Sequence, residues 1–166
     1  MSIALYPGTF DPITFGHIDI AVRATHIFTR VYAVVAENPA KHHLFTDEER
    51  IELAREAFRE YPKIKVISYP GLIVDCLRKY NAKVIIRGMR ALSDFDYEFQ
   101  MAFTNRNMLS GTETVFLMPS AEYVYLNSTM VKDIAKLGGE VGSFVPECVQ
   151  KRLRKKYARG EKREIK

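Results

Sequence analysis

The N-terminal segment from residue 3 to residue 17 has the sequence IALYPGTFDPITFGH. It begins with a short apolar run, passes through a loop rich in Gly, Pro and Thr, and ends in Gly16-His17. The apolar run is typical of a strand, and the pattern from residue 16 onward is typical of a helix. A helix that begins directly after a strand and such a loop offers free backbone N–H groups and the positive end of its dipole, which attract phosphate.

The rest of the chain alternates apolar runs with helical patterns. Strands are predicted at residues 3–6, 30–37, 64–68, 84–86 and 114–118, and helices at 16–29, 46–61, 72–80, 94–109, 128–137 and 146–159. The second helix opens with a capping box formed by Thr46 and Glu49. Strands that are apolar throughout suit a parallel sheet covered on both faces. We therefore expect an α/β fold, a Rossmann-like parallel five-stranded sheet with helices on both faces.

The length of 166 residues predicts one domain over residues 1–166, with a basic C-terminal helix and tail at about 146–166. Neither a membrane span nor a signal peptide is recognisable, so a cytoplasmic location is expected. Cys76 and Cys148 lie far apart in helical patterns and are interpreted as reduced core residues.

The net charge of +5 is concentrated at the C-terminal end. Residues 151–166 hold nine Lys or Arg against two Glu, so the other 150 residues carry a net charge of −2. A basic tail on a nearly neutral body is usually a solvated helix end. Binding of nucleic acid by this tail stays as an alternative from a different functional class, although no aromatic residues alternate with the charges apart from Tyr157.

Polar and cationic residues follow four of the predicted strands. They are Thr9 and His17 after the first, Lys41-His42-His43 after the second, Arg87 and Arg90 after the fourth, and Ser120 with Asn127-Ser128-Thr129 after the fifth. Parallel strands present their carboxyl ends at one edge of the sheet, where ligands bind. These residues therefore predict an anion site. His42-His43 lacks an evident third metal ligand, His26 is interpreted as a surface residue, and the acidic run of Asp94, Asp96 and Glu98 suits a helix start.

Four segments together resemble one family. Residues 6–17, YPGTFDPITFGH, resemble the first motif of the nucleotidyltransferase superfamily, which ends in His-x-Gly-His; Thr14 replaces the first histidine. Residues 85–90 (IIRGMR), 116–120 (FLMPS) and 126–132 (LNSTMVK) continue the likeness in the same order. The chain thus resembles bacterial phosphopantetheine adenylyltransferases over nearly its whole length. It departs from the common final motif Ile-Ser-Ser-[Ser/Thr] at Leu126-Asn127-Ser128-Thr129.

The resemblance implies a set of functional residues. It assigns catalysis to His17, Lys41 and Arg90, and contact with the acceptor substrate to Thr9, Lys41, Ile73 and Arg87. It assigns ATP binding to Thr9, Phe10, His17, Gly88, Met89, Arg90, Glu98, Tyr123, Val124, Tyr125, Leu126, Asn127, Ser128 and Thr129. No metal-ligating protein residue is expected, and Mg²⁺ is expected to arrive with ATP.

The resemblance also implies the reaction. It is transfer of AMP from ATP to 4′-phosphopantetheine, which gives dephospho-coenzyme A and pyrophosphate. A homohexamer and feedback inhibition by coenzyme A are further expectations, whereas membrane or nucleic-acid partners are not expected. A related nucleotidyltransferase with another phosphorylated acceptor, such as nicotinamide mononucleotide, is the alternative. Residue types and spacing by themselves reach only a phosphate-binding α/β protein.

Overall fold

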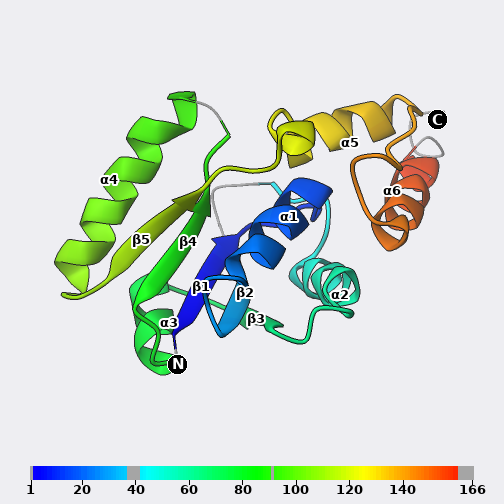
Figure 1. Ribbon diagram of the computed structural model, residues 1–166. Helices are drawn as coiled ribbons and strands as arrows, with labels where there is room; N and C mark the ends of the chain where they lie inside the picture. The colour runs from blue at the N-terminus through cyan, green and yellow to red at the C-terminus, as the bar shows by residue number, and fades with distance from the viewer. Residues whose placement is uncertain (1, 37–41, 91, 161–166) are drawn as a thin grey trace.

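A parallel five-stranded sheet forms the centre of the molecule (Figure 1). The computed structural model describes residues 2–36, 42–90 and 92–160. The strands are β1 (Ile3–Gly8), β2 (Arg30–Ala36), β3 (Ile64–Tyr69), β4 (Val84–Gly88) and β5 (Glu113–Leu117), arranged in the order β3-β2-β1-β4-β5. All four neighbouring pairs are parallel. The predicted fold class is confirmed.

Helices cover both faces of this sheet. They are α1 (Phe15–Ala24), α2 (Asp47–Ala57), α3 (Ile73–Lys79), α4 (Leu92–Met108), α5 (Ser128–Lys136) and α6 (Glu147–Gly160), with a 3-10 turn, η1, at Ala121–Tyr123. Figure 1 shows α4 beside β5 at one end of the molecule and α6 at the opposite end. None of the helices in the described ranges is long and apolar enough to cross a membrane.

Alternate residues of each strand enter two separate hydrophobic cores. Ala4 and Tyr6 join a large core with residues of α1, α2, α5 and α6, while Leu5 joins a smaller core that includes Cys76 and Leu77 of α3. Successive side chains of a strand point to opposite faces, so both sets must be apolar when both faces are covered. This explains the near-continuous apolar runs from which the strands were predicted.

Two strands extend two residues further than predicted. β1 continues through Pro7 and Gly8, and β4 includes Arg87 and Gly88, which were expected in a loop. Proline lacks an N–H group and is normally excluded from central strands. Here the pairing of β1 with β4 ends at Leu5, so no ladder hydrogen bond from the Pro7 nitrogen to β4 is required.

Helix boundaries differ at one place in particular. The helix predicted at 16–29 ends at Ala24, because Thr25 turns the chain out of the helix: its hydroxyl donates to the Val22 carbonyl at 2.6 Å. The predicted capping box is confirmed. Thr46 Oγ1 accepts a hydrogen bond from the Glu49 N–H, and the Glu49 carboxylate accepts one from the Thr46 N–H at 2.9 Å.

A fully buried arginine joins α2 to the carboxyl ends of two strands. Arg50 donates from Nη1 to the Thr9 carbonyl at 2.6 Å and the Ala36 carbonyl at 3.1 Å, and from Nη2 to Asp47 at 2.6 Å. Thr9 follows β1 directly and Ala36 ends β2. Arg50 therefore fixes the spacing of the two chain segments that leave the sheet beside its carboxyl edge.

Replacing Arg50 with alanine is expected to lower the free energy of unfolding by about 3 kcal/mol, because it removes the hydrogen bonds to two partly buried carbonyls and leaves a cavity behind. Urea unfolding measures this change. Arg55→Ala, in the same helix but exposed, is the matched control and should cost less than about 0.5 kcal/mol. Equal stability of the two variants would show that the buried contacts of Arg50 do not hold these segments.

Candidate nucleotide and phosphate site

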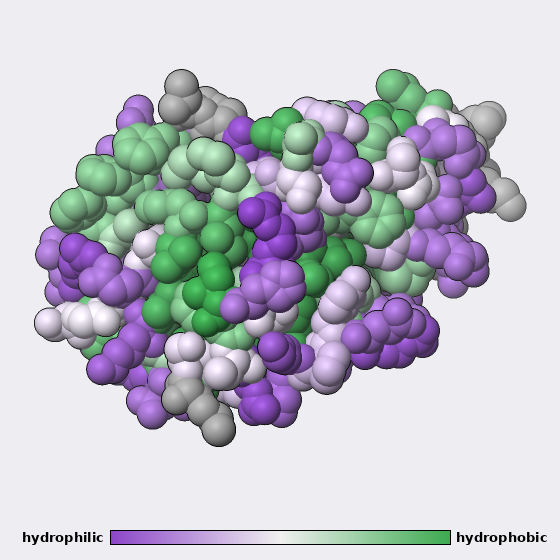
Figure 2. All heavy atoms as spheres, in the orientation of Figure 1, coloured by the Kyte–Doolittle hydropathy of each residue, from purple (hydrophilic) through white to green (hydrophobic). Residues whose placement is uncertain are grey.

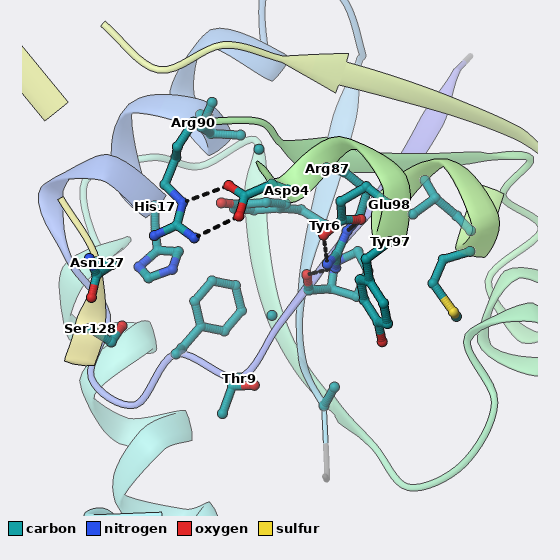
Figure 3. A pocket seen from close by; sticks show the side chains of 18 of the residues that line it. Tyr6, Thr9, His17, Arg87, Arg90, Asp94, Tyr97, Glu98, Asn127 and Ser128 are labelled. Atoms are coloured by element: carbon teal, nitrogen blue, oxygen red, sulfur yellow. Dashed lines mark hydrogen bonds and ion pairs between the residues drawn. The ribbon is translucent and has the colours of Figure 1, made fainter. Parts of the chain in front are cut away.

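A cavity of about 930 Å³ opens at the carboxyl edge of the sheet. It lies where the strand order reverses, between β1 and β4, which is the usual ligand position in open parallel sheets. Segments from both halves of the chain line it: the loop after β1, the start of α1, the end of β4, the inner side of α4, and the start of α5. Figure 3 shows the polar side chains of these segments turned toward one space.

His17 is fixed in one orientation by the start of its own helix. Thr14 is the N-cap of α1, and its backbone N–H donates to His17 Nδ1 at 3.0 Å. The Thr14 hydroxyl lies 2.9 Å from the same nitrogen and accepts from the His17 N–H. Since Nδ1 is an acceptor, the proton of the neutral ring sits on Nε2. The threonine that replaces the first motif histidine thus forms a reciprocal cap with His17.

The surroundings of His17 keep it uncharged. Burial, followed by the positive charge of Arg90, lowers the pKa of His17 from 6.5 to about 4. Its ring meets the edge of Phe10 at a centroid distance of 5.2 Å. At neutral pH the side chain is therefore a neutral donor through Nε2–H, held beside a cation and available to the cavity (Figure 3).

Phe10 occupies the turn between β1 and the loop. Its backbone has a φ of 49°, an uncommon value for a bulky residue, and its side chain is buried. The ring lies against Gly8, where an added Cβ would come within 2.8 Å of it. A side chain at position 8 would therefore collide with the buried Phe10 ring unless that ring moved.

Asp11 joins three segments of the cavity wall. Its buried carboxylate accepts hydrogen bonds from the N–H groups of Leu44 and Phe45 at 3.0 and 2.9 Å, and from Lys132 Nζ of α5 at 2.9 Å. Burial by itself would raise the pKa of Asp11, but these hydrogen bonds outweigh burial and lower the pKa. Asp11 is therefore a carboxylate at neutral pH, and it holds Lys132 at the cavity.

The two arginines at the end of β4 have different partners. Arg87 donates from Nε and Nη2 to Glu98 at 2.6 and 2.5 Å, and from Nη1 to the Pro7 carbonyl at 2.9 Å. Burial would lower the pKa of Arg87, but the Glu98 carboxylate raises it. Arg90 forms a looser pair with Asp94, with nitrogen–oxygen distances of 3.3 and 3.5 Å. Both guanidinium groups border the same cavity.

The start of α5 forms the opposite wall. Asn127 is its N-cap and accepts from the Met130 N–H at 2.8 Å, so the residue that departs from the family motif caps the helix as predicted. Ser128 donates its hydroxyl proton to the Pro12 carbonyl at 2.8 Å. That hydroxyl therefore joins α5 to the loop after β1, and the free N–H groups of the helix start remain for an anion.

Most of the predicted site residues share this cavity. Its lining includes Thr9, Phe10, His17, Ile73, Arg87, Gly88, Arg90, Glu98, Tyr123, Leu126, Asn127, Ser128 and Thr129. Met89, Val124 and Tyr125 are not among the lining residues: the Met89 N–H bonds to the Leu117 carbonyl, and the other two side chains are exposed. Lys41 lies outside the described residues.

Sequence patterns did not identify several lining residues. Asp11, Lys132, Asp94, Tyr97 and Asn105 all border the cavity. Lys132 and Asp94 had a usable signal, because each lies four residues from a predicted site residue, Ser128 and Glu98, and thus on the same helix face. Within the described ranges, no group of three or more His, Cys, Asp or Glu could hold a metal ion.

The fold and this cavity define a nucleotidyltransferase-type α/β protein, and residues 5–134 match the family described as cytidylyltransferase-like. A Polynucleobacter necessarius phosphopantetheine adenylyltransferase is 50% identical over 95% of this chain and 96% of that protein. The enzyme of the same name from Methylococcus capsulatus is 51% identical over 93% of this chain and 96% of that protein. The chain belongs to the phosphopantetheine adenylyltransferase family.

A solved structure shares the fold. It is a Vibrio parahaemolyticus protein assigned as a nicotinate-nucleotide adenylyltransferase, with a TM-score of 0.68 and coverage of 92% of this chain and 91% of that chain. The two sequences are only 15% identical, so this likeness concerns the fold.

The lowered pKa of His17 makes stability depend on pH. Below pH 6.5 the unfolded chain binds a proton at His17, whereas the native state does so only near pH 4. The stability that comes from the neutral ring is therefore complete above pH 6.5 and is lost as pH falls from 6.5 toward 4. The difference in unfolding free energy between the wild type and His17→Gln should shrink from pH 7.5 to pH 5. An NMR titration midpoint of His17 near 6.5 would contradict this.

Proposed function

We propose that this chain transfers AMP from ATP to 4′-phosphopantetheine and releases dephospho-coenzyme A and pyrophosphate. The observation that carries the proposal is the convergence, in one cavity, of a neutral histidine donor, two arginines and two helix starts. The chain's roughly 50% identity to enzymes named for this activity supports the choice of acceptor.

The proposed reaction needs charge stabilisation more than a protein nucleophile. A phosphate oxygen of the acceptor attacks the α-phosphorus of ATP, a new P–O bond forms, and the bond to pyrophosphate breaks. Both the attacking and the leaving group are anionic phosphates, so the protein's task is to align them and offset the charge on the five-coordinate phosphorus. His17 suits this task because its Nε2–H needs no proton transfer to act as a donor at neutral pH.

The other groups divide between the two substrates. Arg90, Lys132 and the helix starts of α1 and α5 are available to the phosphates of ATP, while Thr9 and Arg87 border the same space for the acceptor phosphate. Arg87 has five N–H donors and uses three on Glu98 and Pro7, so one remains on each terminal nitrogen. Lys41 is proposed as a further cation for the acceptor by its resemblance to a family lysine.

Mg²⁺ is proposed to enter with the triphosphate. The described residues form no carboxylate cage, which suits an ion that keeps several waters and binds through substrate phosphates. When bound, the ion would neutralise phosphate charge. The protein contributes the fixed cations and the N–H groups of the helix starts.

The cavity lining favours a long acceptor. Ile73, Met101 and Met108, from α3 and α4, add an apolar surface to the phosphate-binding groups. A pantetheine chain would bury its methylene and methyl groups there, whereas the ribose and pyridine of nicotinamide mononucleotide offer no such chain. Nicotinamide mononucleotide remains the comparison acceptor.

The basic helix gives little support to the nucleic-acid alternative. In α6, Arg152 pairs with Glu49 and Glu52, and Lys156 pairs with Glu49 at 2.7 Å. Arg154 pairs with Glu140 at 2.9 Å. These cations hold α6 against α2 and the loop before α6, so they are already neutralised within the molecule. A cytoplasmic location and inhibition by coenzyme A are proposed on family grounds.

Incubation with ATP and Mg²⁺ should release pyrophosphate with 4′-phosphopantetheine and not with nicotinamide mononucleotide.

In the same assay His17→Ala should lower kcat about a hundred- to thousandfold, because one transition-state donor is lost, while the Kd for ATP changes little. Release of pyrophosphate with the nucleotide acceptor alone would reject the proposed substrate. Near-normal turnover of His17→Ala would remove His17 from its role.

We propose a homohexamer as the assembly. Phe95, Phe99 and Phe103 form an exposed stripe on α4, with ring centroids 5.2 and 4.7 Å apart. Figure 2 shows hydrophobic side chains gathered on the face formed by α4 and the neighbouring strands. An apolar patch of this kind often marks a subunit contact.

Light scattering should give six times the monomer mass for the wild type and a smaller mass for Phe99→Lys, since a charge in the stripe must be desolvated on association. Ile27→Lys, at another exposed apolar residue outside α4, is the matched control and should keep the wild-type mass. A monomeric wild type would reject the proposed assembly.

A further inference from the structure

Two carboxylates of α4 lie one helical turn apart, and each holds one of the arginines at the end of β4. Glu98 binds Arg87, and Asp94 binds Arg90 (Figure 3). Since residues four apart share a helix face, α4 presents both carboxylates to the cavity from one side. Both arginines that border the phosphate space are therefore paired within the protein before any substrate binds.

The two pairs differ in strength. Glu98 holds Arg87 through two short, parallel hydrogen bonds, and its side chain is only 11% exposed. Asp94 lies 3.3 Å from Arg90 Nε and 3.5 Å from Nη2, and the side chains are 41% exposed for Arg90 and 28% for Asp94. Partly exposed pairs with long contacts are weak, whereas a bidentate pair with short hydrogen bonds is stronger. Arg87 is thus a fixed part of the wall, and Arg90 is the guanidinium that can change partners.

The position of Arg90 shows what replaces Asp94. Figure 3 shows its guanidinium between His17 and Asp94, above the space that the start of α5 also borders. A phosphate group offers the same planar pair of acceptor oxygens as a carboxylate, with more negative charge, and it would meet the His17 donor as well. A bound nucleotide phosphate and Asp94 therefore compete for one guanidinium fork.

We propose that Asp94 is a positioning residue for Arg90: it holds the guanidinium at the cavity in the unliganded protein and gives it up to a nucleotide phosphate. This rests on the proposed function for the identity of the ligand. An internal competitor lowers the apparent affinity by the fraction of time that it occupies the site. For a pair of this exposure, the expected loss of affinity is about two- to sixfold. The same competition assists release of pyrophosphate, since the carboxylate re-engages Arg90.

Isothermal titration with ATP, in the absence of acceptor, tests the proposal. Asp94→Asn should bind ATP about two- to sixfold more tightly than the wild type, and pyrophosphate likewise. Asp96→Asn is the matched control: it removes the same charge from α4 two residues further on, at an exposed position, and should leave the Kd unchanged. In an Arg90→Ala background, Asp94→Asn should no longer tighten binding, because the two residues act through one interaction.

Unchanged or weaker ATP binding by Asp94→Asn overturns the proposal. Weaker binding that occurs only with Mg²⁺, and not with EDTA, would assign the carboxylate to the metal and would overturn it too. Asp94 lies in the first turn of α4, where it stabilises the helix dipole, so Asp94→Ser serves as a second variant if Asp94→Asn unfolds. Wild-type turnover with each acceptor tests the proposed function separately from this binding comparison.

Discussion

The buried carboxylate of Asp11 is the contact on which the arrangement of the cavity wall depends. It collects two backbone N–H groups from Leu44 and Phe45 and the ammonium of Lys132, which are 33, 34 and 121 residues away in the chain. A carboxylate withdrawn from water must have its acceptor positions filled, so these three segments cannot move independently. The loop after β1, the approach to α2 and the start of α5 thus form one unit.

Other contacts extend this unit to the helix starts. The Ser128 hydroxyl binds the Pro12 carbonyl, and the Phe15 N–H binds the Phe144 carbonyl, so α1 and α5 open beside the same loop. Each helix start carries partial positive charge, although the Phe15 and His17 N–H groups of α1 are already bonded within the protein. Because these groups are held before a substrate arrives, little reorganisation is needed when negative charge develops at the phosphorus of a transferred nucleotidyl group. Neutral His17, held by Thr14, adds an oriented N–H donor to the positive potential of the helix starts.

The sequence was most informative where the determinants are local. The strands followed from apolar runs, and the capping box from Thr46 and Glu49, because each depends on residues a few positions apart. Helical periodicity overestimated the length of α1, since it could not show that the Thr25 hydroxyl would donate a hydrogen bond to the Val22 carbonyl. The site motifs located His17, Arg87 and Arg90 through family resemblance.

What the sequence could not show is pairing between distant segments. Asp11 and Arg50 look like ordinary surface residues in the sequence, and their burial results from partners on other elements. Met89 lies between two lining residues, but the strand end turns its N–H toward Leu117 and its side chain does not line the cavity. Contacts of this kind are decided by the packing of the whole sheet, which local periodicity does not record.

The acidic run on α4 illustrates how one local pattern can serve different purposes. Of the three carboxylates at positions 94, 96 and 98, only Asp94 lies in the first turn of the helix, and only Asp94 and Glu98 face the arginines. Glu98 holds Arg87 by two short hydrogen bonds, while Asp94 holds Arg90 by longer contacts, which is the difference behind the proposed exchange. An enzyme that binds a triphosphate and then releases pyrophosphate gains nothing from binding the triphosphate and the pyrophosphate equally tightly. A rigid cation beside an exchangeable one separates positioning of the substrate from release of the product.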